Sequence, residues 1–178
     1  MLESFHLRGF GVLSYDYPGY GESSGSPSEE GCYQAISLSY QHLTENLGVA
    51  PDKVVLVGQS VGSGPTTWLA AREKHAAVVL ISPFLSAFRS VTRIPLFPGD
   101  RFPNDKHLRN VKTPLLVIHG EDDKVIPFSN GRTLFDKSPS KQKTFLPVQG
   151  AGHNDLFLSG RFDLGELILA MLDQQAEN

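Results

Sequence analysis

Residues 54–62 read Val-Val-Leu-Val-Gly-Gln-Ser-Val-Gly, and this stretch decides the fold. Its four apolar residues suit a buried strand, and the Gly-x-Ser-x-Gly pattern that follows is typical of a tight strand-to-helix turn. Such a turn brings strand and helix backbone close together, so we expect a side chain at Gly58 or Gly62 to collide with its neighbours. The small residues Gly62-Ser63-Gly64 then begin a helix.

Strand-like and helix-like segments alternate along the rest of the chain, which predicts a mostly parallel sheet covered by helices. The expected strands are residues 10–15, 53–57, 77–82, 115–119 and 144–147. The expected helices are a short one before Gly9, one from a Ser26–Glu29 capping box to about Leu47, one from Ser60 to about Lys74, one at 130–136 and one at 155–175 capped by Asn154 or Asp155. The sequence therefore predicts a single three-layer α/β/α domain over residues 1–178.

Composition and charge exclude several classes of function. The net charge is −3, so the chain lacks the basic surface that a nucleic-acid partner needs. The single cysteine, Cys32, cannot form an internal disulfide, which favours a cytoplasmic location and a structural role for this residue. The first nine residues lack the basic and apolar regions of a signal peptide, and no apolar run is long enough for an integral membrane segment.

Residues that can activate a serine follow the turn in chain order. A serine hydroxyl is a weak nucleophile at neutral pH and needs a base within hydrogen-bond reach and a carboxylate that orients the base. The nucleophile candidate is Ser60, and the base candidate is His153, in a glycine-rich loop after the last expected strand. The carboxylate candidates are Asp123 and Asp122, just beyond the end of strand 115–119, where ligands gather in parallel sheets.

Each of these residues also has a simpler interpretation. Ser60 alone fits a turn residue, and His153 alone fits a loop or capping residue. His119 is a second base candidate, although its place at a strand end favours a packing role. Asp16 fits turn chemistry. No metal site is expected, because the remaining histidines have no metal-ligand spacing and receive no site role: His6, His42, His75 and His107.

Together these motifs resemble the α/β-hydrolase superfamily along nearly the whole chain. The matching stretches are residues 8–10, 15–23, 58–62, 119–123 and 150–155, and residues 82–86 and 150–155 are most similar to abhydrolase-type depalmitoylases and their bacterial relatives. The last position of the family's His-Gly-x-x-Asp motif is the acid, which implies Asp123 rather than Asp122. The resemblance implies a serine hydrolase of esters, thioesters or amides with no metal or organic cofactor.

The resemblance has one large departure, at the N-terminus. Family chains carry further strands before Arg8, and the loop after a central one supplies one oxyanion-hole N–H. The resemblance therefore implies an α/β-hydrolase fold that lacks its first strands, with the N–H of Val61 as the remaining oxyanion donor. We interpret Met1 as an internal methionine of a longer reading frame, in preference to the start of a genuine short form with impaired catalysis.

The substrate site is expected to be open. Residues 83–113 carry four prolines and several aromatic residues and are predicted to form a lid-like insertion. The pocket candidates are Tyr17, Tyr20, Gln59, Phe84, Leu85 and Phe88, with Ile94, Leu96, Phe97 and Phe102 as further wall residues; a satellite apolar cluster under a long loop is the alternative for the insertion. We predict hydrolysis of a small-molecule or acyl-chain ester or thioester. The alternatives are a peptidase or amidase on the same residues and a non-catalytic binding protein, and the sequence does not fix the oligomeric state.

Overall fold

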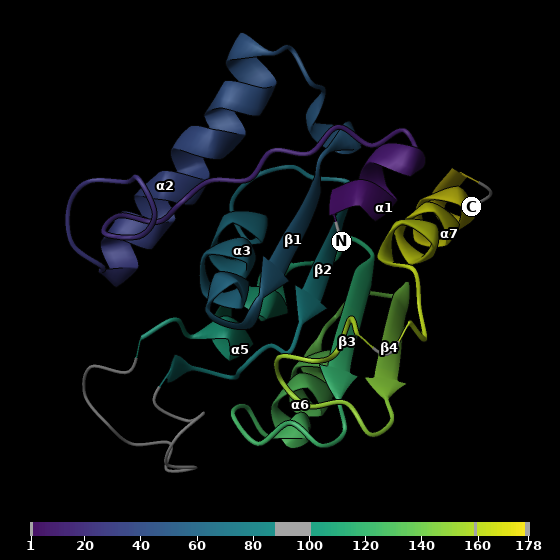
Figure 1. Ribbon diagram of the computed structural model, residues 1–178. Coiled ribbons are helices and arrows are strands. Elements are labelled where there is room, and N and C mark those ends of the chain that lie inside the picture. Colours follow the sequence, from purple (N-terminus) through teal and green to yellow (C-terminus); the bar gives the residue numbers. More distant parts are fainter. Residues whose placement is uncertain (1, 88–100, 159, 177–178) are drawn as a thin grey trace.

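The computed structural model describes residues 2–87, 101–158 and 160–176, and its centre is a parallel sheet of four strands (Figure 1). The strands, in their order across the sheet, are β1 (Val55–Gln59), β2 (Ala77–Ile81), β3 (Leu115–Gly120) and β4 (Lys143–Val148). Every adjacent pair is parallel. Four of the expected strands are thus confirmed, with ends that move by a few residues.

Helices connect and cover these strands. The α-helices are α1 (Leu2–Leu7), α2 (Glu29–Gln41), α3 (Ser63–Ala70), α5 (Asn104–His107), α6 (Phe128–Lys137) and α7 (Leu164–Ala176). Further helical turns are η1 (His42–Asn46), η2 (Pro51–Lys53), η3 (Ser60–Gly62) and η4 (Leu108–Asn110).

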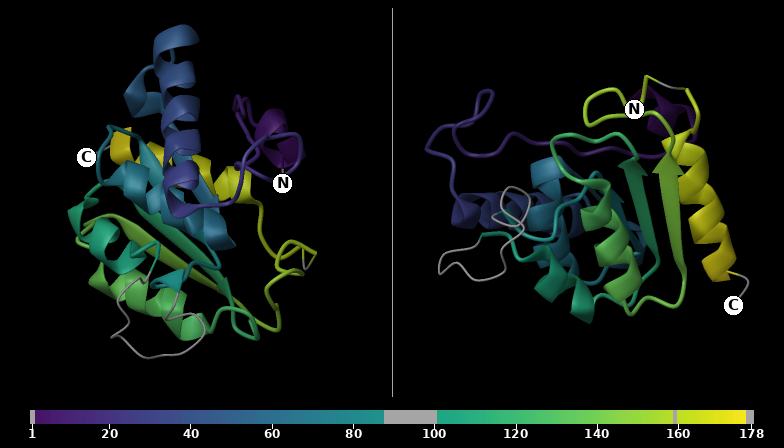
Figure 2. Two further views of the ribbon diagram at one scale, coloured as in Figure 1. Left: turned by 90° about the vertical axis from the view of Figure 1, so that its left-hand side faces the viewer. Right: turned by 90° about the horizontal axis from the view of Figure 1, so that it is seen from below.

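The sheet separates two apolar cores, which confirms the predicted three-layer α/β/α architecture (Figure 2). On one face, Leu80 and Val117 pack with residues of α2, α3 and α6. On the other face, Val79 and Ile118 pack with residues of α1 and α7. Because side chains alternate between the faces of a strand, β2 and β3 are buried along their whole length. Their continuous apolar runs follow from this double burial.

The N-terminal strand expected at residues 10–15 is absent from the described sheet. Residues 10–15 follow an irregular path past β1, although Phe10 and Tyr15 still pack against the two cores. A strand needs a neighbour to bond its N–H and C=O groups, and β1 has a hydrogen-bonded neighbour on its β2 side alone within the described residues. The apolar pattern of residues 10–15 is therefore used for packing and not for sheet pairing.

Three helix ends also differ from expectation. The N-cap of α2 is Ser28, whose side chain accepts from the Gly31 N–H at 3.0 Å, and not Ser26. The helix after Ser60 ends at Ala70, where Arg72 N–H turns back to the Leu69 carbonyl at 2.8 Å. The closing helix begins at Leu164, because the side chain of Asp163 caps the Glu166 N–H at 3.0 Å.

Part of the expected lid-like insertion is helical. Residues 104–110 form α5 and η4, and Phe102 packs in a third apolar cluster with Phe84, Tyr33 and Ile126. Residues 88–100, which include the expected wall residues Phe88, Ile94, Leu96 and Phe97, lie outside the described residues. Among the helices that the structure describes, none has the length and apolar character needed to cross a membrane.

Candidate active site

Ser60 stands on a strained turn at the end of β1. Its φ of 52° lies in the left-handed region, which non-glycine residues seldom adopt. The turn is tight because Gly58 has no side chain: a Cβ there would lie 2.6 Å from Thr66 Oγ1 and 2.7 Å from the Gly62 carbonyl oxygen. The steric expectation is confirmed for Gly58. It is wrong for Gly62, where a Cβ would meet its nearest atom, Tyr17 Oη, at 3.5 Å.

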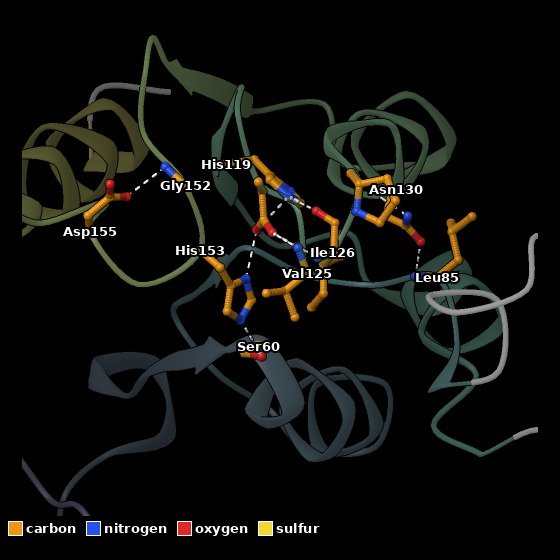
Figure 3. Close-up of polar contacts among 11 residues, drawn as sticks. Ser60, Leu85, His119, Val125, Ile126, Asn130, Gly152, His153 and Asp155 are labelled. Atoms are coloured by element: carbon orange, nitrogen blue, oxygen red, sulfur yellow. Dashed lines mark hydrogen bonds and ion pairs between the residues drawn. The ribbon is translucent and has the colours of Figure 1, made fainter.

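His153 lies between the side chains of Ser60 and Asp123 (Figure 3). Its Nδ1 is 2.7 Å from Asp123 Oδ2, and its Nε2 is 3.0 Å from Ser60 Oγ. A carboxylate at neutral pH only accepts, so Nδ1 carries the hydrogen and Nε2 offers a lone pair to the serine hydroxyl. The geometry is that of a nucleophile, a base and an orienting carboxylate.

The loop after β3, residues 121–127 and here called the acid loop, fixes the carboxylate of Asp123. Asp123 Oδ1 accepts from the N–H groups of Val125 at 2.8 Å and Ile126 at 2.7 Å. The Asp123 side chain is 0 % exposed, whereas Asp122 is exposed at the surface. Of the two carboxylates that sequence spacing left open, Asp123 is the one in contact with His153.

The loop that carries His153 is fixed against the acid loop. The Asp122 N–H donates to the Ala151 carbonyl at 3.0 Å, and a Cβ at Gly120 would collide with the same peptide group. The side chain of Asp155 accepts from the Gly152 N–H at 2.6 Å (Figure 3). Asp155 therefore holds this loop. The sequence position of Asp155 had suggested a cap for α7, but α7 begins only at Leu164.

The other base candidate, His119, points away from the serine. Its side chain is 0 % exposed, and its Nε2 donates to the Ile126 carbonyl at 3.0 Å. Burial lowers the pKa of His119, so the ring is neutral at neutral pH. The same Nε2 lies 3.4 Å from Asp123 Oδ2, a contact that sequence reasoning missed. The two residues are four positions apart, but one lies at the end of β3 and the other lies in the loop after it, so their contact depends on the fold of that loop.

The expected oxyanion donor, the N–H of Val61, lies in the turn after Ser60. Val61 follows Ser60 in η3 at the start of the helical segment, where backbone N–H groups have no intrahelical carbonyl. The Ser63 hydroxyl donates to the Ser60 carbonyl at 2.7 Å, which fixes the peptide between Ser60 and Val61. The Val61 N–H therefore belongs to a peptide that is held in place beside Ser60.

The expected pocket residues are only partly gathered. Phe84 is buried, and Tyr17 packs beside it in the third cluster, where burial raises the pKa of the Tyr17 hydroxyl. Leu85 is half-buried, and its N–H donates to Asn130 Oδ1 at 3.0 Å. Tyr20 and Gln59 are exposed, and Phe88 lies outside the described residues.

Two surface clefts lie away from Ser60. One, of about 350 Å³, is lined by Asp52, Ala70, Glu73, Lys74, His75, Asn110, Val111, Lys112 and Thr113. The other, of about 510 Å³, is lined by Ser28, Glu29, Glu30, Tyr33, Trp68, Arg101, Pro103 and His107. Neither contains an expected pocket residue. Across the described ranges, no group of three or more His, Cys, Asp or Glu residues is arranged to hold a metal ion.

Comparison with known proteins agrees with this fold. A family model described as alpha/beta hydrolase fold matches residues 1–108, and one described as serine aminopeptidase, S33, matches residues 104–157. The alpha/beta hydrolase domain-containing protein aho-3 of Caenorhabditis elegans is 41 % identical over 97 % of this chain and 51 % of its own length. Alpha/beta hydrolase domain-containing protein 17C of Mus musculus is 43 % identical over 85 % of this chain and 48 % of its own length. The chain thus spans about half the length of these curated relatives.

Solved structures share the fold at low identity. An alpha-beta hydrolase from Vibrio vulnificus has a TM-score of 0.76 at 21 % identity, covering 96 % of this chain and 66 % of the other. A monoacylglycerol lipase from Paleococcus ferrophilus has a TM-score of 0.69 at 21 % identity, covering 97 % and 87 %. With the matched family model over more than half of its residues, the chain belongs to the α/β-hydrolase family.

Proposed function

We propose that this chain is a serine hydrolase that cleaves carboxylic esters or thioesters through a covalent acyl-enzyme. The observation that carries the proposal is the continuous hydrogen-bonded path from Ser60 Oγ through the His153 ring to Asp123, with distances of 3.0 and 2.7 Å. A serine in a merely structural turn has no need of an imidazole oriented by a buried carboxylate.

The proposed first half-reaction forms the acyl-enzyme. Ser60 Oγ attacks the carbonyl carbon while its proton moves to His153 Nε2, and the carbonyl oxygen becomes an oxyanion beside the Val61 N–H. The tetrahedral intermediate then collapses, the bond to the leaving alcohol or thiol breaks, and His153 returns the proton to that group. Asp123 stabilises the imidazolium that exists between these two transfers.

The second half-reaction hydrolyses the acyl-enzyme and regenerates the free Ser60 hydroxyl. His153 takes a proton from water, and the hydroxide attacks the acyl carbon, which forms a second oxyanion at the same place. Collapse breaks the bond to Ser60 Oγ, which recovers the proton from His153. The products are a carboxylic acid and the free enzyme.

Esters and thioesters are favoured over amides because the amine of an amide must be protonated as it leaves, whereas an alcohol or thiol is a better leaving group. Aminopeptidase activity is the second candidate, because residues 104–157, which carry Asp123 and His153, match the serine aminopeptidase model.

The test is labelling of the chain by a fluorophosphonate, which reacts with an activated serine. We expect labelling of the wild-type chain, none of Ser60→Ala, and strongly reduced labelling of His153→Ala. The exposed Ser24→Ala variant is the matched control and should label normally. A folded wild-type chain that does not label would overturn the proposal in favour of a binding protein. Parallel assays with p-nitrophenyl esters, acyl thioesters and aminoacyl p-nitroanilides distinguish the two candidate activities.

A further inference from the structure

His119 contacts the carboxylate of the proposed triad from inside the protein. Its Nε2 lies 3.0 Å from the Ile126 carbonyl oxygen and 3.4 Å from Asp123 Oδ2 (Figure 3). Because a carbonyl oxygen only accepts, Nε2 carries the ring hydrogen. This N–H donates to the carbonyl, and the carboxylate lies close to the same nitrogen; both side chains of the His119–Asp123 pair are 0 % exposed.

The opposite nitrogen of the ring keeps His119 neutral. Nδ1 has no hydrogen-bond partner among the described residues and packs against Gly131 of α6, where a Cβ would collide with it. A proton on Nδ1 would therefore be buried without an acceptor, which is costly. Burial accordingly lowers the pKa of His119.

Two titratable groups of the described residues act on this ring. They are Asp123, from the acid loop, and His153, from the loop after β4. Helix α6, which packs on β3, contributes the ring of Phe128, with centroids 5.8 Å apart, and the backbone of Gly131. Neither of these titrates, so the electrostatic partner of His119 is the Asp123–His153 pair.

We propose that His119 is a positioning residue for the triad, whose neutral Nε2–H holds Asp123 in place and withdraws negative charge from the oxygen that pairs with His153. The inference rests on the proposed function. Asp123 Oδ2 accepts from His153 Nδ1 at 2.7 Å and lies 3.4 Å from His119 Nε2, while Oδ1 accepts two backbone N–H groups. A carboxylate with less charge on Oδ2 stabilises protonated His153 less.

The test is an NMR titration of the His153 ring in the 178-residue chain, together with the pH profile of fluorophosphonate labelling. His119→Leu removes the donor, so the midpoint of the His153 titration should rise by about half a unit or more. The midpoint on the acidic side of the labelling-rate profile should shift to higher pH by the same amount. His119→Gln keeps an N–H donor and should restore the midpoint. The NMR titration needs no turnover, so it tests the inference even if the hydrolase activity fails.

Two further variants separate positioning from a general packing effect. In Gly131→Ala the new Cβ would collide with Nδ1 and displace the ring without changing residue 119, so the midpoint should move from its wild-type value. It carries the test if His119→Leu does not fold. His75→Leu is the matched control, because His75 is also buried and hydrogen-bonded, to Thr113 at 2.6 Å, but lies outside the site. An unchanged His153 midpoint in His119→Leu and Gly131→Ala, or an equal shift in His75→Leu, would overturn the inference.

Discussion

The Nδ1 of His153 donates to an oxygen of Asp123 that is shielded from solvent: the atoms are 2.7 Å apart, and the Asp123 side chain is 0 % exposed. This bond fixes the tautomer of His153, because Nδ1 must carry the hydrogen. The lone pair of Nε2 then faces Ser60 Oγ at 3.0 Å. The pair therefore determines whether the serine proton has an acceptor.

Replacing Asp123 by asparagine should remove the lone pair of His153 Nε2 as the acceptor of the serine proton. The amide can donate to His153 Nδ1, which favours the tautomer with the hydrogen on Nε2, directed at the serine. We expect the rate of fluorophosphonate labelling and of ester hydrolysis to fall by about 10³- to 10⁴-fold, with the fold retained. Asp122→Asn, at the exposed neighbouring position, is the control and should react at the wild-type rate. An Asp123→Asn chain with near-normal rates would contradict the assigned tautomer.

The two glycines of the turn should differ sharply in their tolerance of alanine. At Gly58 the new Cβ would lie 2.6 Å from Thr66 Oγ1 and 2.7 Å from a backbone carbonyl oxygen, so strand and helix must separate. We expect Gly58→Ala to lower the free energy of unfolding by about 1–3 kcal/mol, measured by urea denaturation. At Gly62 the nearest atom would be 3.5 Å away, so Gly62→Ala should be nearly neutral. Equal losses for both variants would show that the turn is not limited by this contact.

Local sequence rules predicted the elements whose cause is local. The β1 strand and the turn at Ser60 follow from an apolar run ended by Gly58, and the buried strands β2 and β3 follow from uninterrupted apolar runs. Residues 10–15 have a comparable pattern and form no strand, because strand formation also needs a pairing partner that lies elsewhere in the chain.

The site was predictable to the extent that motifs carried it. Ser60, Asp123 and His153 were identified from spacing and resemblance, and the structure brings them together. The contact between His119 and Asp123 depends on how the acid loop folds back over β3, which spacing does not reveal. Nor does spacing reveal that Asn104 bonds Ser63 and Phe84, which lie far from it in the sequence.

Asn104 should be one of the most costly side chains to remove. It is fully buried and joins α5 to α3 and to the loop after β2. Its Nδ2 donates to Ser63 Oγ at 3.0 Å and to the Phe84 carbonyl at 2.9 Å, and its Oδ1 accepts from Thr67 at 2.7 Å. Asn104→Ala leaves these groups without partners, so we expect a loss of about 2–4 kcal/mol in the free energy of unfolding.

The same variant should also lower the rate at which Ser60 reacts with a fluorophosphonate. Ser63 bonds the Ser60 carbonyl at 2.7 Å, so a freed Ser63 hydroxyl weakens the support of the nucleophile. Urea denaturation and fluorophosphonate labelling measure the two effects. The exposed Asn110→Ala is the matched control for both. An Asn104→Ala chain as stable as that control would contradict the assigned network.

Stability should fall as the pH drops through the range in which unfolded histidines titrate. Burial lowers the pKa of His75, His107 and His119 in the folded chain, while the same residues in the unfolded chain titrate near their ordinary value of about 6.5. Below that pH the unfolded state binds more protons than the folded state. Each histidine therefore contributes stability that is fully present above about pH 6.5 and is lost as the pH falls toward its folded pKa.

The slope is at most about 1.4 kcal/mol of unfolding free energy per pH unit for each histidine. Urea denaturation at a series of buffered pH values from about 7.5 to about 5.5 measures this slope. His75→Gln should flatten the dependence because one of the three titrations is removed, whereas His42→Gln, at an exposed position, should leave the slope unchanged. A wild-type chain whose unfolding free energy is constant across this range would contradict the neutral, buried state of these rings.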